Sequence, residues 1–151
     1  MKKIISFTKE GLAEKQNELN ILQNDRINAV TELQRAREMG DLSENAAYKV
    51  ARSRLSGIDR RIRYLERILK HVVVVEKRMD GRVGMGNTVI VQDGTVQVNL
   101  VIVDGHESDF MKGKISGYSP IGRALLGKRV GESIDVFTPG GKKTITILHI
   151  T

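Results

Sequence analysis

Residues 8 to 38 place apolar and polar side chains with the period of an α-helix. Proline is absent from this stretch and Gly11 is its only glycine, which favours an uninterrupted helix. Lys15 and Arg26 interrupt the apolar stripe, so we expect a partner that tolerates polar residues in the contact. The apolar positions of the stripe, at spacings compatible with a seven-residue repeat, are Leu12, Leu19, Leu22, Ala29, Leu33 and Ala36.

A second helical pattern begins at Ala51 and supplies that partner. Its apolar residues follow at alternating spacings of four and three residues, as in the a and d positions of a coiled coil. They are Leu55, Ile58, Ile62, Leu65, Leu69 and Val72. Two helices joined by a short connection fold back on each other. Residues 1–78 are therefore predicted to form an antiparallel α-helical coiled-coil hairpin, a rod about 45 Å long.

Beyond this hairpin the pattern changes to a period of two, and glycine becomes frequent. Three glycines in residues 78–86 mark the boundary. Strands are expected near 88–92, 95–103, 113–117, 133–137 and 143–150. One short helix is expected between the later strands, with Ser119 as its N-cap and Pro120 at its first position. Residues 79–151 are thus predicted to form a small antiparallel β-sheet domain with one helix, which gives the chain an α+β fold.

Charge is concentrated in the predicted hairpin. The chain has 25 Lys and Arg against 18 Asp and Glu, a net charge of +7. Such an excess attracts polyanions, either nucleic acid or an acidic protein surface. Part of it forms a stripe on the second helix, made of Arg52, Arg60, Arg63, Arg67 and Lys70. The solvated flank of a coiled coil has the same spacing, so the stripe alone leaves both interpretations open.

Several classes of site are excluded or disfavoured by composition. The chain has no cysteine, which excludes disulfides and thiolate chemistry and favours a cytoplasmic location. No apolar run approaches the roughly 20 residues of a membrane span. Its three histidines stand in unrelated contexts, and its glycine pairs lack the spacing of phosphate-binding loops. We therefore expect no membrane segment, no cofactor bound by the chain alone and no self-contained active site.

The connection between the two helices carries the remaining candidate chemistry. It reads MGDLSENAAY over residues 39–48. Asp41 and Glu44 have the spacing of a capping box, with Gly40 able to end the first helix and Asp41 or Ser43 able to cap the second. The two carboxylates are also hard oxygen ligands of the kind that Mg²⁺ prefers, and Mg²⁺ often takes only one or two of them. One acid can cap while the other reaches outward, so the two interpretations are compatible.

Three stretches in this order resemble the bacterial Gre transcript-cleavage factors, GreA and GreB. They are FTKEGLAEKQNELNIL, AREMGDLSENAAY and KISGYSPIGRALLGKRVGESIDVFTPGG, and the SENAAY wording is GreA-like. The resemblance covers essentially the whole chain. It implies that the hairpin enters the secondary channel of bacterial RNA polymerase while an FKBP-like C-terminal domain docks at the outer rim. There the factor stimulates the polymerase to hydrolyse the 3′ end of backtracked RNA.

The same resemblance assigns expected roles to individual residues. The catalytic acids of the tip, segment 40–45, would be Asp41 and Glu44, which would hold Mg²⁺ only together with the polymerase. The residues expected to support the tip are Gly40, Ser43 and Asn45. The residues expected to contact the 3′ segment of nascent RNA are Arg37, Arg52, Arg60 and Arg63. The residues expected to dock on polymerase are Ser119, Pro120, Gly122 and Arg123. The chain would then be a monomeric accessory factor and not an enzyme by itself.

Three other functions remain open at this stage. A relative that occupies the same channel without stimulating cleavage would inhibit or modulate the polymerase. An FKBP-like domain also raises the hypothesis of peptidyl-prolyl isomerase activity, although fold alone does not confer it and few aromatic residues are present. A basic hairpin that binds DNA or RNA through charge alone is the third alternative. Ala47, where the family usually carries an acid, leaves the preferred length of the cleaved fragment open.

Overall fold

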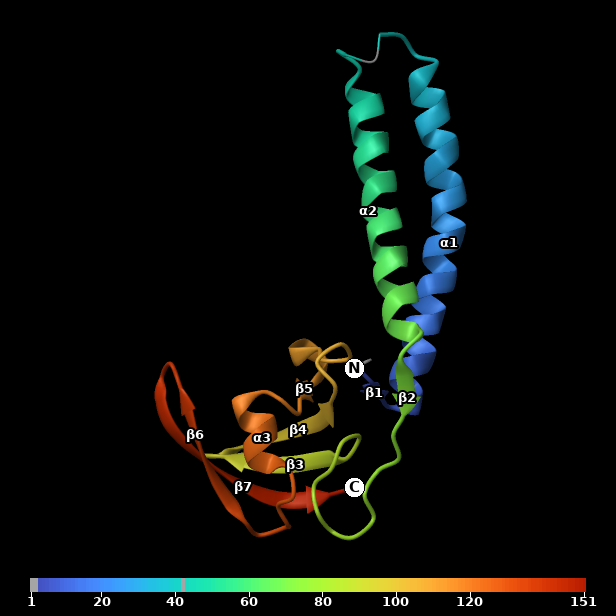
Figure 1. The fold of residues 1–151 in the computed structure, drawn as a ribbon. Helices are drawn as coiled ribbons and strands as arrows, with labels where there is room; N and C mark the ends of the chain where they lie inside the picture. Colours follow the sequence, from blue (N-terminus) through green and yellow to red (C-terminus); the bar gives the residue numbers. More distant parts are fainter. Residues whose placement is uncertain (1–2, 42) are drawn as a thin grey trace. The chain divides into compact units, whose positions relative to one another are not determined.

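The computed structural model describes residues 3–41 and 43–151 and divides them into two compact units (Figure 1). One unit is Leu12–His71, and the other combines the described residues up to Gly11 with Val72–Thr151. This division follows the pairing of two short parallel strands, β1 (Ile5–Phe7) and β2 (Val72–Val74). The sequence analysis placed the boundary at residue 78, where the period of the sequence changes. The structure instead groups the described residues up to Gly11, and those from Val72 onward, with the sheet.

The predicted hairpin consists of α1 (Lys9–Arg37) and α2 (Ala46–Leu69), which run antiparallel as neighbours (Figure 1). Seam positions of both helices are buried, namely Ala29, Ala36, Ala51, Ile62 and Leu65. The last predicted seam residue, Val72, lies in β2 and not in the helix. Consecutive β-branched valines follow at this point, and such residues favour a strand over a helix.

Ion pairs on the hairpin surface join the two helices. The carboxylate of Glu18 accepts two hydrogen bonds from the guanidinium of Arg61, at 2.5 and 3.1 Å. Arg26, which interrupts the apolar stripe of α1, reaches Asp59 of α2 at 2.6 Å. The hydrogen bond from Arg61 holds the pKa of Glu18 below its ordinary value. Exposed pairs contribute at most about 1 kcal/mol each, so they chiefly fix the register of a seam held by apolar burial.

The second unit contains a five-stranded sheet in the order β5-β4-β3-β7-β6. The strands are β3 (Thr88–Asp93), β4 (Val96–Val103), β5 (Lys114–Ser116), β6 (Ser133–Thr138) and β7 (Gly141–Ile150). The predicted α+β fold is confirmed. The sheet differs from the prediction in one pairing, because β4 and β5 are parallel. The connection between them includes the 3₁₀ turn η1 (Phe110–Lys112), which lets the chain return in the same direction.

The predicted short helix is α3 (Pro120–Leu125), and it packs on the sheet (Figure 1). The hydroxyl of Ser119 accepts a hydrogen bond from the Gly122 N–H at 3.0 Å, which confirms Ser119 as the N-cap. Leu125 of α3 is fully buried among the valine and isoleucine side chains of one sheet face. Among the described residues, no helix is long and apolar enough to cross a membrane.

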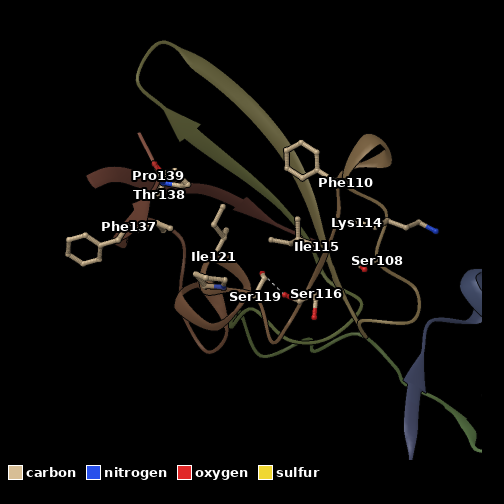
Figure 2. A pocket seen from close by; sticks show the side chains of 12 residues that line it. Ser108, Phe110, Lys114, Ile115, Ser116, Ser119, Ile121, Phe137, Thr138 and Pro139 are labelled. Carbon is tan, nitrogen blue, oxygen red and sulfur yellow. Dashed lines mark hydrogen bonds between the residues drawn. The ribbon is translucent and has the colours of Figure 1, made fainter. Parts of the chain in front are cut away.

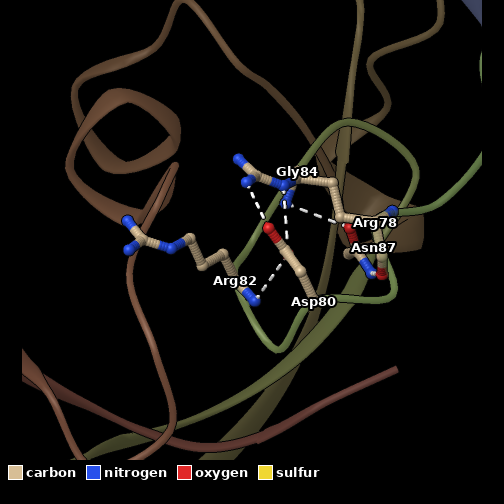
Figure 3. Close-up of polar contacts among 5 residues, drawn as sticks. All are labelled: Arg78, Asp80, Arg82, Gly84 and Asn87. Atoms are coloured by element: carbon tan, nitrogen blue, oxygen red, sulfur yellow. Dashed lines mark hydrogen bonds and ion pairs between the residues drawn. The ribbon is translucent and has the colours of Figure 1, made fainter.

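A buried amide organises the glycine-rich segment that precedes the sheet (Figure 3). The Asn87 side chain is fully buried, and its oxygen accepts hydrogen bonds from the N–H groups of Arg78 and Gly84. Its amide nitrogen donates to the carbonyl oxygens of Arg78 and Thr151. The Arg78 guanidinium also binds the carboxylate of Asp80. This segment is therefore a hydrogen-bonded loop fixed to the end of the last strand.

Candidate functional site

Asn45 holds the two helix ends together at the closed end of the hairpin. Its side-chain oxygen accepts a hydrogen bond from the Tyr48 N–H at 3.0 Å, as the N-cap of α2. Its amide nitrogen donates to the carbonyl oxygen of Ala36 at 2.7 Å, in the last turn of α1. One side chain thus satisfies a backbone donor of α2 and a backbone acceptor of α1, groups that helix ends leave without partners.

This geometry corrects the expected capping box. Neither Asp41 nor Ser43 is the N-cap of α2, because the helix begins after Asn45. Glu44 directly precedes that cap, so it cannot occupy the third position of the helix as a capping box requires. Gly40 has a φ of 134°, in the positive range expected for a residue that ends a helix. Both acids are therefore outside the α2 cap.

Asp41 and Glu44 are exposed side chains on the connection between the helices. The Asp41 carboxylate accepts a hydrogen bond from the Ser43 N–H at 3.0 Å. This bond, with a further hydrogen bond from the Ser43 hydroxyl, lowers the pKa of Asp41 below its ordinary value. Both hydrogen bonds favour the carboxylate form of Asp41. The intervening residue 42 lies outside the described residues.

The tip acids do not form a complete metal centre. Among the residues that the structure describes, no group of three or more His, Cys, Asp or Glu side chains could hold a metal ion. Two exposed carboxylates supply hard oxygen ligands, which suit Mg²⁺ when water or another molecule provides the remaining ligands. The arrangement can therefore contribute to a metal site shared with another molecule.

Five of the six arginines of α2 fall into two groups with different partners, and the sixth, Arg67, lies over the ring of Tyr64. Arg54 and Arg61 bind acids of α1, at 2.5 Å in each case. The predicted RNA-contacting residues Arg52, Arg60 and Arg63 are exposed and have no acidic partner within the described part of the chain. The second group is therefore free to attract an anion.

Arg37 is the predicted RNA-contacting residue on α1. Its guanidinium lies over the ring of Tyr48, 5.9 Å from the ring centroid, and its side chain is exposed. A cation on an aromatic face keeps its charge and its hydrogen-bond donors. Tyr48 belongs to the first turn of α2, next to its cap. Arg37 is therefore a cation that lies four residues before Asp41 in the sequence and contacts the first turn of α2.

The sheet unit carries a separate hollow, the aromatic groove, of about 410 Å³. Figure 2 shows Phe110 and Phe137 on opposite sides of it, with Ile115 and Ile121 between them. Phe110 and Phe137 are 82% and 78% exposed. Exposed phenylalanines beside an apolar hollow are typical of a protein-binding surface. Sequence reasoning missed this groove, although the outward position of Phe137 in the alternating pattern of β6 was a signal for it.

The four expected docking residues have different positions. Ser119 and Pro120 line the aromatic groove. Gly122 is buried, and a Cβ atom there would lie 2.1 Å from the Ser116 carbonyl oxygen, so this glycine permits close packing of α3. Arg123 is exposed and does not line the groove. Of the four expected docking residues, the structure therefore places Ser119 and Pro120 together at the aromatic groove.

Comparisons with known proteins agree along the whole chain. The family model "Transcription elongation factor, N-terminal" matches residues 5–74, and "Transcription elongation factor, GreA/GreB, C-term" matches residues 78–151. Transcription elongation factor GreA of Rhodospirillum rubrum is 42% identical, with 92% of each chain covered. GreA of Caldanaerobacter subterraneus subsp. tengcongensis is 41% identical over 99% of each chain. The solved structure of the transcription factor Gfh1 is 28% identical over 99% of each chain, with a TM-score of 0.50.

Proposed function

Because the chain belongs to the GreA/GreB family of transcription elongation factors, we propose that it stimulates bacterial RNA polymerase to cleave the 3′ end of backtracked RNA. The observation that carries the proposal is the pair of exposed acids, Asp41 and Glu44, at the closed end of a basic hairpin. In this role the chain is an accessory factor that enters the secondary channel, and the polymerase performs the hydrolysis. Cleavage rescues arrested complexes because it returns the RNA end to the active site.

The tip residues fit a shared Mg²⁺ ion. Asp41 accepts hydrogen bonds from Ser43, which lower its pKa, and the exposed Glu44 provides a second carboxylate. Bound between these oxygens and the polymerase, the ion would supply an activated water for in-line attack on the RNA phosphate. Asn45 positions both acids, because it fixes the end of α1 and the start of α2 to each other. Ser43 orients Asp41 through its backbone N–H.

The unpaired arginines of α2 support contact with the displaced RNA. Arg52, Arg60 and Arg63 are spaced along one side of the helix, and none is neutralised by an acid among the described residues. A phosphate backbone attracts such guanidinium groups without sequence preference. The arginines that already bind acids of the other helix have no such role in this proposal.

The aromatic groove supports docking of the sheet unit on a protein. Its Phe110, Phe137 and Pro120 supply rigid apolar surface that would be released from water on binding. We assign this groove to the outer rim of the polymerase channel. Ser119 also lines it, whereas Gly122 contributes by holding α3 close to the strand.

A cleavage assay tests the proposed function. Purified polymerase is stalled in a backtracked state with RNA labelled at its 5′ end, and the wild-type chain is added. Shortening of the labelled RNA is expected with wild type and not with an Asp41→Ala, Glu44→Ala double variant. If the wild-type chain binds the polymerase without accelerating cleavage, it acts as the non-cleaving modulator and the proposal is wrong.

A further inference from the structure

The hairpin has an apolar hollow close to its tip, which we call the tip groove. It measures about 440 Å³ and lies on the hairpin between the last turns of α1 and the first turns of α2. Its apolar lining consists of Ala36, Met39, Ala46, Ala47, Val50 and Ala51. Small side chains on both helices leave the hollow open, because alanine fills little space between the neighbouring backbones.

Two large apolar side chains of the tip groove face solvent. Met39 is 72% exposed and Val50 is 69% exposed. Neither contributes to the buried seam of the hairpin, so the coiled coil itself does not require an apolar residue at these positions. Apolar side chains grouped around a hollow lower the free energy of association when a partner removes them from water.

The charges around the tip groove disfavour a nucleic acid as the partner. Glu32 and Arg54 on its border bind each other at 2.5 Å, so their charges largely cancel. Among the described residues that line the groove, Arg35 is the one remaining cation. At 100° per residue, Val50 lies about 160° around α2 from Arg52, one of the unpaired arginines assigned to RNA. RNA on the arginine side and the tip groove therefore occupy different faces of α2.

We propose that the tip groove binds an apolar segment of the RNA polymerase wall beside the active site, with an acidic residue facing Arg35. The inference rests on the proposed function, because Met39 and Ala46 of the groove directly flank the tip segment that this function places in the channel. Met39 immediately precedes the tip segment and Val50 is in the first turns of α2, so a channel wall near the tip acids reaches both. The contact holds the hairpin in place while the arginine side faces the RNA.

Photocrosslinking identifies what occupies the groove. Benzoylphenylalanine replaces Val50 in the full chain, and a second variant carries it at Ile27. Ile27 is a matched control because it is 67% exposed and lies about 180° around α1 from Ala36 of the groove. With backtracked complexes, the probe at position 50 is expected to crosslink to a polymerase subunit more strongly than the probe at position 27. A crosslink to RNA alone, or equal crosslinking at both positions, overturns the proposal.

Substitution measures what the groove contributes. A Met39→Gln, Val50→Gln double variant removes the apolar surface, and glutamine is a good helix former at position 50 in α2. Its half-maximal concentration for cleavage is expected to rise by about 10-fold, with the rate at saturation unchanged. Ile27→Gln is expected to match wild type, and a thermal melt verifies that all variants fold alike. The proposal fails if the double variant matches Ile27→Gln, or if it lowers the saturating rate instead.

The two proposals fail in different ways. If the wild-type chain does not stimulate cleavage, the proposed function is wrong. The crosslinks from positions 50 and 27 to polymerase then still test whether the tip groove binds polymerase. If wild type stimulates cleavage but Met39 and Val50 can be changed without effect, the cleavage function stands and the groove contact is wrong.

Discussion

The carboxylate of Glu107 accepts hydrogen bonds from both the backbone N–H and the hydroxyl of Thr8, which stands 99 residues earlier in the chain. Glu107 is only 5% exposed. The Thr8 hydroxyl in turn accepts a hydrogen bond from the Gly11 N–H at 3.0 Å, as an N-cap of α1. An acid at the positive end of a helix is favourable. The first turn of α1 is thereby fixed within the same compact unit as the sheet.

The glycines of the two hairpin helices, Gly11 and Gly57, should respond to alanine in opposite ways. A Cβ atom at Gly11 would lie 2.0 Å from a Glu107 carboxylate oxygen, so Gly11→Ala displaces Glu107 from Thr8. We expect a loss of about 1 to 3 kcal/mol in the free energy of unfolding. Gly57 meets nothing within 4 Å, so Gly57→Ala should raise it by about 0.5 to 1 kcal/mol. Urea unfolding of both variants measures this, and two changes of the same sign would refute the role of Glu107.

The sequence predicted the repetitive parts of the fold well and the single contacts poorly. The two helices were visible because their apolar residues recur over many turns, and five strands because they alternate. The three-residue strands β1 and β2 were not predicted, because each directly adjoins a long helical pattern. The pairing of Thr8 with Glu107 could not be predicted, since one chain carries no signal that joins residues so far apart.

At the tip, too, the sequence predicted which residues matter but not the individual hydrogen bonds that they make. Sequence reasoning singled out Asp41 and Glu44, and it expected Gly40 near the end of the first helix, where the structure has a positive φ three residues beyond Arg37. It chose the wrong N-cap because Asp41, Ser43 and Asn45 are all good capping residues within five positions, and only the backbone path selects one of them. The roles of the two acids in cleavage stay a prediction.

Asn45 should be the residue on which the order of the tip depends. Asn45→Ala removes the cap of α2 and the hydrogen bond to Ala36, and we expect a cost of about 1 to 2 kcal/mol. Asn45→Asp keeps the acceptor for Tyr48 but loses the donor, so it should cost less than alanine. Ser43→Ala serves as the control, because Ser43 is exposed and outside both helices. Thermal melts rank the variants, and equal stability of Asn45→Ala and Ser43→Ala would contradict this assignment.

The Glu18–Arg61 pair should make hairpin stability depend on pH. Because the folded pKa of Glu18 is lowered, its stabilisation is complete above the pKa of an unfolded glutamate, about 4.3. It is lost as the pH falls through the lower, folded value. Wild type should therefore melt above Glu18→Gln near neutral pH and approach it in acid, as measured by circular dichroism. Glu66→Gln, on the exposed surface of α2, controls for general acid effects. A constant difference at all pH values would exclude this linkage.

Substitutions in the two groups of arginines should have different effects, one on RNA contact and the other on the stability of the hairpin. An Arg60→Gln, Arg63→Gln variant removes unpaired cations, so its melting temperature should equal that of wild type. Its crosslinking to backtracked RNA should weaken, and the slope of log affinity against log salt should fall by about 1.4 for two single-strand contacts. Arg54→Gln with Arg61→Gln should instead lower the melting temperature slightly, because it breaks two ion pairs between the helices. If both variants weaken RNA crosslinking equally, the distinction is wrong.

The Mg²⁺ dependence of cleavage measures whether Asp41 and Glu44 bind the metal ion that cleavage requires. Backtracked complexes are titrated with Mg²⁺ in the presence of wild type or of Asp41→Asn, Glu44→Gln, which preserves side-chain shape but removes both charges. We predict that wild type lowers the Mg²⁺ concentration needed for half-maximal cleavage. The amide variant should leave it at the value of polymerase alone while still binding the polymerase. Equal Mg²⁺ dependence with wild type and the amide variant would contradict a metal-binding role for the tip acids.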